Sequence, residues 1–208
     1  MADRPRPAGT WLYIEGERAD KIWYVKRGVV VLSRLSDDSH GNSVAWAVRP
    51  AGSLLGMEGL VRNDYLDSAR AVTDVVICAA SRDEIRSWLD GSGSAACGML
   101  DLVLLSQDRD APRPGRGAGS ADARVSRWLL ENDADVVNVI PRAVIADLLG
   151  MLPETFSRAL ASLSARGAIS VTRRSIRILN AALLRTTAEF SPGSPPPYQG
   201  AEVDRLPA

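Results

Sequence analysis

The arrangement of side chains that most clearly suggests chemistry lies in the segment LPETFSRALASL, in the C-terminal third of the chain. At helical spacing, Glu154, Ser157 and Arg158 share one face, and Phe156 and Leu160 lie on the other. An arginine on such a face can donate to O6 and N7 of guanine together, and a glutamate can accept from the N4 amino group of cytosine. The pattern therefore fits a DNA major groove, although an ordinary pair of helices with a charged exterior has the same periodicity.

The surrounding residues give this segment the proportions of a helix-turn-helix. A helical pattern over 142–149 is followed by a three-residue break at 150–152, and a second helix is expected to start at Pro153. Proline suits the first helical position because no intrahelical bond needs its missing N–H there. The following segment, ISVTRRSIRIL, alternates polar and apolar residues and is expected to form a small hairpin.

The basic charge of the chain is concentrated in the same region. Residues 141–185 contain seven arginines and two acidic residues, whereas residues 1–110 contain 13 basic and 16 acidic residues. The net charge of the whole chain is zero, so the local excess is visible only when the chain is divided. A basic segment on an otherwise acidic chain is the electrostatic pattern expected of a protein that binds a polyanion.

Composition excludes several other classes of protein. The sequence has no apolar run long enough for a transmembrane helix and no signal-peptide pattern at its start. Its two cysteines, Cys78 and Cys97, lack CxxC spacing, which favours a reducing cytoplasm. A single histidine, His40, and the lack of any catalytic or metal-binding motif argue against an enzyme. We therefore expect a soluble cytoplasmic protein without a membrane partner, a metal or a cofactor.

The N-terminal half predicts a different architecture. From Trp11 to about Ser81 the sequence alternates short strand-like runs with turn signals, which favours a closed or double-sheet antiparallel fold. Ser81 is expected to cap a helix over 81–89. A second helix, over 94–109, is apolar on nearly every side and must be buried against something. After a loop rich in proline and glycine, Ser120 is expected to cap the next helix.

Together these segments predict an α+β chain. Its parts are an N-terminal antiparallel β-roll or jelly roll, a dimerisation helix, a linker, a C-terminal winged helix-turn-helix and a disordered tail. Their expected bounds are residues 1–90, 91–110, 111–119, 120–185 and 186–208, in that order.

Motifs in both halves resemble the CRP/FNR superfamily of bacterial transcription regulators. The segment from Arg142 to Leu179 looks like the winged helix-turn-helix of that family, with Glu154, Thr155, Ser157 and Arg158 as its most specific part. Upstream, YIEGERADKIWYVKRGVVVLSRL is similar to the family's cyclic-nucleotide-binding-type β-roll, and GSLLGMEGL is similar to its effector cassette. The resemblance covers about residues 12–180.

The resemblance implies a homodimer that binds double-stranded DNA at a palindromic promoter site and contacts RNA polymerase as an activator. Arg142 matches a phosphate-contacting position, and the wing arginines are expected to contact the backbone too. The residues expected to bind DNA are Arg142, Pro153, Glu154, Thr155, Ser157, Arg158, Arg173, Arg174 and Arg177. The residues expected to pair the dimer are Ala96, Met99, Leu100 and Val103.

Three departures from the family pattern matter. Leu152 replaces the usual serine before the recognition helix, so a side-chain cap is missing, at a cost of about 1 kcal/mol. Tyr65 and Leu66 stand where cyclic-AMP receptors carry Arg-Ser, and Met57 stands where they carry glutamate, with Glu58 displaced by one residue. The effector pocket is therefore expected to be vestigial and not to bind cyclic AMP. Its remaining residues are Gly56, Glu58, Tyr65 and Arg70.

The linker is a further departure, because its prolines and glycines are expected to break the rigid connection between the two halves and to couple them only weakly. Other readings of the whole chain stay open. One alternative is an effector-gated regulator that responds to an unidentified small molecule or redox signal. The others are a repressor and a signal-binding module that regulates a partner protein.

Overall fold

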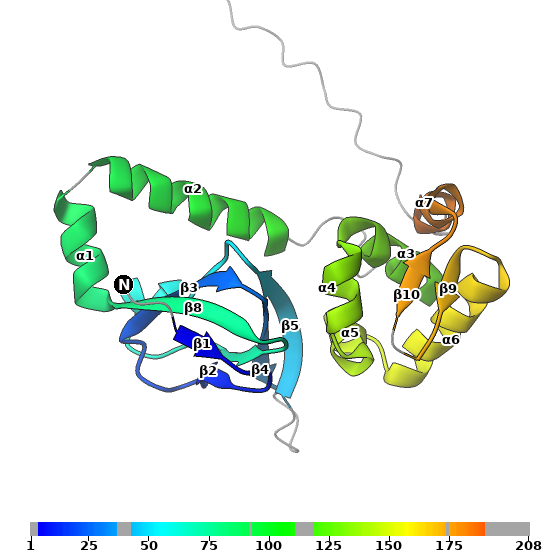
Figure 1. The fold of residues 1–208 in the computed structure, drawn as a ribbon, viewed down its shortest axis with the longest axis horizontal. Coiled ribbons are helices and arrows are strands. Elements are labelled where there is room, and N and C mark those ends of the chain that lie inside the picture. The colour runs from blue at the N-terminus through cyan, green and yellow to red at the C-terminus, as the bar shows by residue number, and fades with distance from the viewer. Residues whose placement is uncertain (1–3, 37–42, 92, 111–118, 174, 190–208) are drawn as a thin grey trace, which may run out of the picture.

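The computed structural model describes residues 4–36, 43–91, 93–110, 119–173 and 175–189. A β-roll with two following helices forms the N-terminal half, and a helical domain with a small hairpin forms the C-terminal half (Figure 1). This α+β architecture confirms the fold class expected from the sequence. The linker over 111–118, the tail over 190–208 and His40 lie outside the described residues.

The β-roll consists of two antiparallel four-stranded sheets that enclose one apolar core. The first sheet has the strand order β1 (Arg4–Arg6), β8 (Val75–Ser81), β3 (Lys21–Arg27), β6 (Leu54–Leu55). The second has the order β2 (Trp11–Tyr13), β7 (Ser68–Ala71), β4 (Val29–Leu35), β5 (Ser43–Pro50). A short 3-10 helix, η1 (Met57–Leu60), follows β6.

Alternation along the strands fills the core from both sheets. Val30 and Leu32 of β4 point into it beside Ala69 of β7 and Val25 and Ile77 of the first sheet, all at most 4% exposed. Gly28 makes the turn between β3 and β4 at φ 89°, where a Cβ would lie 2.5 Å from the Asp74 carbonyl oxygen. The expected tight turn at this glycine is therefore confirmed.

Two helices follow the β-roll. In α1 (Arg82–Gly91), Glu84 Oε2 accepts from the backbone N–H of Ser81, and the Ser81 hydroxyl accepts from the Glu84 N–H, a reciprocal cap that confirms the expected helix start. The next helix, α2 (Gly93–Asp110), carries the expected dimerisation segment. Its Met99 is 9% exposed and packs with Ile22 and Ile85 of its own chain.

Met99 differs from the other expected dimer contacts because it is already buried within a single chain. Met99 faces the β-roll of its own chain, because burying this side chain there holds the helix against its domain. Ala96 and Leu100 remain exposed, and Val103 is partly buried. Among the four residues that the sequence suggested, these three are left to pair two chains.

The C-terminal domain is a helical cluster with a wing. It contains α3 (Ala121–Glu131), α4 (Ala134–Val139), α5 (Arg142–Leu148), α6 (Pro153–Ala165), β9 (Ile169–Val171), β10 (Ile176–Ile178) and α7 (Ala181–Glu189). Its core includes Trp128 and Leu129 of α3, Ile145 of α5, and Phe156 and Leu163 of α6, each at most 6% exposed. The expected cap at the start of α3 is present, because the Ser120 hydroxyl accepts from the Ala123 N–H at 3.2 Å.

The end of the domain differs from the expected boundary. Residues 186–189, which the sequence assigned to the disordered tail, belong to α7. Leu184 of this helix is fully buried in the domain core, and Thr187 is 7% exposed. Packing of this helix against α3 buries Leu184 and stabilises a segment that is rich in the helix formers alanine and leucine.

The two halves of the chain are in direct contact. Helix α5 packs against strand β5, and Val29 and Val48 of the β-roll join the apolar cluster of the C-terminal domain (Figure 1). Linker composition alone does not predict this contact. Among the helices that the structure describes, none combines the length and apolar character that crossing a membrane requires.

Candidate nucleic-acid interface

The helix α6 presents the expected polar face to solvent. Glu154, Ser157 and Arg158 are exposed, whereas Phe156 and Leu160 are at most 3% exposed. Before α6, α5 and a four-residue turn complete the helix-turn-helix within one residue of the expected bounds. The arrangement leaves a carboxylate, a hydroxyl and a guanidinium on one open helix face.

A local hydrogen bond orients the arginine on this face of α6. The Arg158 Nη2 donates to the Thr155 hydroxyl one turn earlier, at 3.4 Å, which biases the guanidinium toward the N-terminal end of the helix. No side chain caps that end, and Leu152 at the cap position is 71% exposed. The missing cap is therefore confirmed. The N–H groups in the first turn of α6, where Glu154 lies, have no side-chain acceptor at the cap position.

The wing lies beside α5. Arg142, the first residue of α5, donates from Nη2 to the Thr172 carbonyl at the wing turn. Asn138 of α4 accepts from the Ile176 N–H at 2.8 Å and fixes the second wing strand. Arg142 and Arg173 line a common groove of about 530 Å³ between α4, α5 and the wing.

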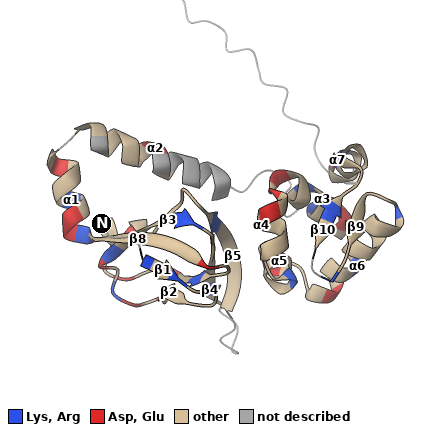
Figure 2. Ribbon diagram, viewed as in Figure 1, with Lys and Arg blue, Asp and Glu red and all other residues tan. Residues whose placement is uncertain are grey.

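The remaining wing arginines complete the basic surface. Arg173 and Arg177 are exposed, and Arg174 lies outside the described residues. Both signs of charge lie on α3, α5 and α6, whereas α4 carries Asp135 and β10 carries Arg177 (Figure 2). The positive charge of the candidate interface is therefore concentrated at the wing, where Arg173 and Arg177 are exposed, and at Arg142 beside it.

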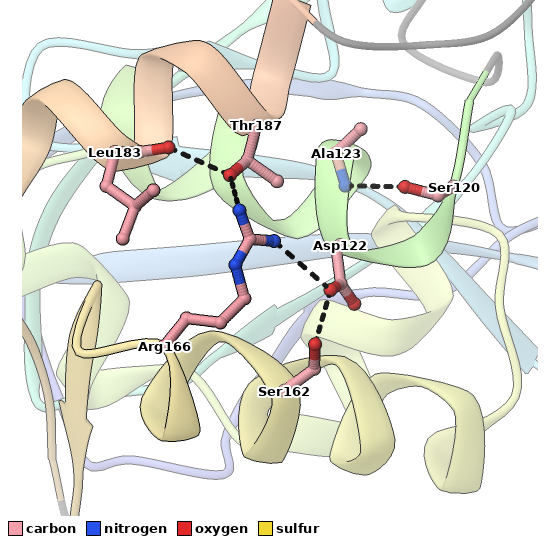
Figure 3. A network of polar contacts seen from close by, with 7 residues as sticks. All are labelled: Ser120, Asp122, Ala123, Ser162, Arg166, Leu183 and Thr187. Carbon is pink, nitrogen blue, oxygen red and sulfur yellow. Dashed lines mark hydrogen bonds and ion pairs between the residues drawn. The ribbon is translucent and has the colours of Figure 1, made fainter.

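A polar cluster behind α6 was not expected from the sequence (Figure 3). The Ser162 hydroxyl donates to Asp122 Oδ2 at 2.6 Å, and Arg166 Nη1 lies 3.9 Å from the same oxygen. Arg166 Nη2 also donates to the Thr187 hydroxyl at 3.1 Å. These residues come from three helices and their ends, so only the tertiary fold brings them together.

The region that matches the family's effector pocket is filled by aromatic side chains. Tyr65 stacks on Tyr13 with ring centroids 3.9 Å apart, and its hydroxyl donates to the Lys21 carbonyl at 2.7 Å. The Tyr65 ring lies so close to Gly56 that a Cβ there would meet Tyr65 Cε1 at 2.7 Å. Burial raises the pKa of Tyr65, as expected for a phenol in an apolar setting.

The polar residues expected in that pocket are engaged elsewhere. Glu58 accepts from the Leu66 N–H at 3.2 Å. Arg70 donates from Nε to the Gly9 carbonyl at 3.1 Å and lies over the Trp11 ring, at 5.3 Å from its centroid. An anionic nucleotide needs a cation and free donors at one place, and these residues supply neither there. In this conformation Glu58 and Arg70 therefore do not form a phosphate site together.

A buried carboxylate lies in the same part of the β-roll. Asp67 is 5% exposed and accepts from the Tyr13 hydroxyl at 3.1 Å. Desolvation, with a smaller effect from Glu58, raises the pKa of Asp67 to about 6, although Tyr13, Arg34 and Arg49 oppose the shift. No sequence pattern marks this group, because a lone aspartate beside a strand usually faces solvent.

Comparison with known proteins supports both halves of this description. Residues 4–92 match the family model of a cyclic nucleotide-binding domain, and residues 123–187 match that of a Crp-like helix-turn-helix domain. The nitrogen fixation regulation protein FixK of Bradyrhizobium diazoefficiens is 28% identical over 193 residues, which cover 87% of this chain and 79% of that protein. A CRP-like cAMP-activated global transcriptional regulator of Mycobacterium tuberculosis is 24% identical over 183 residues, covering 83% and 81% of the two chains.

Solved structures give the same fold. The structure of FixK2 from Bradyrhizobium japonicum superposes with a TM-score of 0.77 at 23% identity, over 92% of this chain and 98% of that one. A CRP-family transcriptional regulator from Thermus thermophilus has a TM-score of 0.72 at 22% identity, over 90% and 97%. Both therefore share the order of β-roll, connecting helix and helix-turn-helix.

Replacing Asp67 with asparagine tests the burial of this carboxylate. The pKa of Asp67 in the folded protein, about 6, lies above the ordinary value of 3.8, so the folded state holds the proton more tightly than the unfolded state. Its favourable contribution is complete below the ordinary value and is lost as the pH rises through about 6. Asp67→Asn should therefore raise the free energy of unfolding by about 1–3 kcal/mol at about pH 8 and change it little at about pH 3, below the ordinary value.

Urea unfolding at both pH values, followed by tryptophan fluorescence, measures this difference. The exposed Asp90 of α1 offers a control, because Asp90→Asn also removes one negative charge. A gain for Asp67→Asn that is equal at the two pH values would contradict the burial of an ionised carboxylate.

Proposed function

The chain belongs to the CRP/FNR superfamily of transcription regulators, and we propose that it binds a palindromic promoter site as a homodimer and activates transcription without cyclic AMP. The single observation that carries this proposal is the exposed face of α6. There Glu154, Ser157 and Arg158 stand free of the domain core, at the helix that a helix-turn-helix inserts into the major groove.

We assign base readout to this face and backbone contact to the surrounding arginines. Arg158 donates to the O6 and N7 of one guanine, and Glu154 accepts from a cytosine amino group. Arg142 and Arg173 bind phosphates from their shared groove beside the wing. The geometry supports this separation of base readout from backbone contact, because Arg142 and Arg173 lie on α5 and the wing, whereas the exposed face lies on α6.

The dimer is proposed through α2. Ala96, Leu100 and Val103 follow helical spacing, and Leu100 is 57% exposed in the single chain. Pairing two copies along this stripe covers these side chains and places two recognition helices on one duplex. A twofold protein then requires a palindromic site with half-sites about one helical turn apart.

The proposal that cyclic AMP is not needed rests on the filled pocket. FixK and the M. tuberculosis cAMP-activated regulator are both relatives, so relationship alone does not decide between the two modes. The Tyr65–Tyr13 stack and the position of Arg70 over Trp11 favour the mode without the nucleotide. Activation, through contact with RNA polymerase at the promoter, is proposed from the activators among the relatives.

Selection of binding sites from random duplexes tests the function as a whole. The full chain should enrich a palindromic sequence that shifts in electrophoresis and is not displaced by a scrambled duplex. Transcription from a promoter that carries this sequence should rise when the protein is added to RNA polymerase. Failure to enrich any sequence would overturn the proposal.

Two arginine variants separate base readout from backbone contact. Arg158→Ala should cost about 1–3 kcal/mol of binding free energy and relax discrimination at one base pair of each half-site. Arg173→Ala should weaken selected and scrambled duplexes alike and lower the salt slope by about one. Arg185→Ala, at an exposed position of α7, controls for the loss of charge. Equal losses on both duplexes for Arg158→Ala would count against base readout.

An aspartate at Leu100 tests the dimer. The native chain should have twice the monomer mass in light scattering, and Leu100→Asp should be monomeric because a charge in a paired apolar stripe is not solvated. Operator affinity should fall by about an order of magnitude or more, since each half-site loses the gain of linkage. Ser87→Asp, on the exposed side of α1, should leave the mass unchanged. A native monomer that binds its operator tightly would refute the arrangement.

Calorimetric titration with cyclic AMP tests the pocket. The native chain should give no binding heat at micromolar nucleotide, and operator binding should be the same with and without it. The reason is steric as well as electrostatic, because the Tyr65 ring occupies the space beside Gly56. A saturable heat signal together with a nucleotide-dependent shift would show that the pocket opens.

A further inference from the structure

Four side chains tie the recognition helix to the rest of its domain. The polar cluster of Asp122, Ser162, Arg166 and Thr187 joins the start of α3, the C-terminal end of α6 and the end of α7 (Figure 3). Thr187 in turn donates to the Leu183 carbonyl at 2.8 Å, so its oxygen is held in place to accept from Arg166. Asp122 lies two residues after Ser120, which caps α3.

The cluster is placed at the ends of helices whose dipoles suit it. The Asp122 carboxylate lies in the first turn of α3, where the helix dipole favours a negative charge. Arg166 follows the last residue of α6, where the dipole favours a positive charge. The helix dipoles therefore favour both charges at the positions where they meet.

Stability of the domain does not depend mainly on this contact. The Arg166 side chain is 45% exposed and its nitrogen lies 3.9 Å from Asp122, and ion pairs of this kind add little to folding. The apolar stripe of α6, with Phe156 and Leu163 fully buried, already holds the helix in the core. Apolar packing has no preferred direction, however, whereas hydrogen bonds do. The apolar stripe therefore sets which side of α6 is buried, and the polar contacts at its end refine the rotation about the helix axis.

We propose that Arg166 is a positioning residue for DNA recognition. It holds the C-terminal end of α6 between the start of α3 and the end of α7, and so fixes the angle at which Glu154 and Arg158 meet the bases. The chain enters the domain beside Asp122, so a movement at that point is passed to the recognition helix through the same contacts. This inference rests on the proposed function of α6 as the helix that reads DNA.

If Arg166 instead contacted DNA directly, its replacement would change DNA binding in a different way. If the guanidinium bound a phosphate directly, its loss would weaken all duplexes alike and lower the salt slope by about one. A positioning residue acts through the base contacts of other residues. Its loss lowers affinity for the selected duplex much more than for a scrambled duplex, on which only the small long-range effect of one lost charge remains, as in Arg185→Gln.

The variant Asp122→Asn distinguishes positioning from a purely electrostatic role, because the two predict opposite changes in DNA affinity. Asp122→Asn removes a negative charge from a DNA-binding domain, so electrostatics alone would strengthen binding to every duplex. The amide oxygen still accepts from Ser162, but the attraction for Arg166 is lost. Positioning therefore predicts weaker binding to the selected duplex in spite of the gain in net charge.

The experiment uses the full chain and a duplex obtained by selection. Arg166→Gln should lower affinity for this duplex roughly ten-fold, and Asp122→Asn should lower it in the same direction. In the double variant the two losses should not add, because they remove one contact. Arg185→Gln, which removes an exposed arginine of α7, is the matched control and should show no loss of specificity.

The outcomes distinguish failure of the inference from failure of the function. If the native chain enriches and binds a palindrome but Arg166→Gln loses affinity equally on scrambled DNA, or Asp122→Asn binds more tightly, positioning is wrong. A second measurement tests the inference on the protein alone, without DNA. Amide hydrogen exchange in the last turns of α6 and α7 should be faster in Arg166→Gln than in Arg185→Gln, with the same melting temperature, and equal exchange would overturn the proposal even if no operator were found.

Discussion

Burial of the apolar stripe of α6 determines what the C-terminal domain can present to a partner. Phe156, Leu160 and Leu163 pack into the core with residues of α3 and α5, and this single contact fixes which side of the helix is left outside. Because the helical repeat is about 3.6 residues, the outside positions are then those of Glu154, Ser157 and Arg158. The recognition face is thus a consequence of core packing, and its direction is refined by polar contacts at the end of the helix.

The β-roll keeps a binding fold, and we propose that its pocket no longer takes a cyclic nucleotide. The two sheets and η1 retain the architecture that matches a cyclic nucleotide-binding domain. Inside, two stacked tyrosines, one of them hydrogen-bonded to a buried aspartate, belong to the core of the roll. The roll still has a structural role, because Val29 and Val48 pack against the DNA-binding half and α2 carries the proposed dimer stripe.

Much of this arrangement could be predicted from residue patterns. The helix-turn-helix, the wing hairpin, the caps at Ser81 and Ser120 and the turn at Gly28 depend on neighbours within a few positions, and each is present. Features that depend on distant parts of the chain were missed. The packing of Met99 on its own β-roll was not foreseen, nor was the continuation of α7 to Glu189 with Leu184 in the domain core. In the candidate site, the exposed face of α6 could likewise be predicted, because it follows from helical periodicity. The hydrogen bonds of Arg166 and Ser162 could not, because they join residues 21 and 40 positions apart in the chain. No local pattern marks such pairs, because an arginine after a helix and an aspartate in a first turn are ordinary surface residues.

The measurement that tests the central claim most directly is atomic substitution within the selected duplex. Replacing one guanine at a time with 7-deazaguanine removes the N7 acceptor that an arginine on α6 would use in the major groove. Loss of affinity at a pair of symmetric guanines, and disappearance of that loss in Arg158→Ala, is the result that the recognition face predicts. Tight binding that is insensitive to every such substitution, or a loss that persists unchanged in the variant, would contradict it.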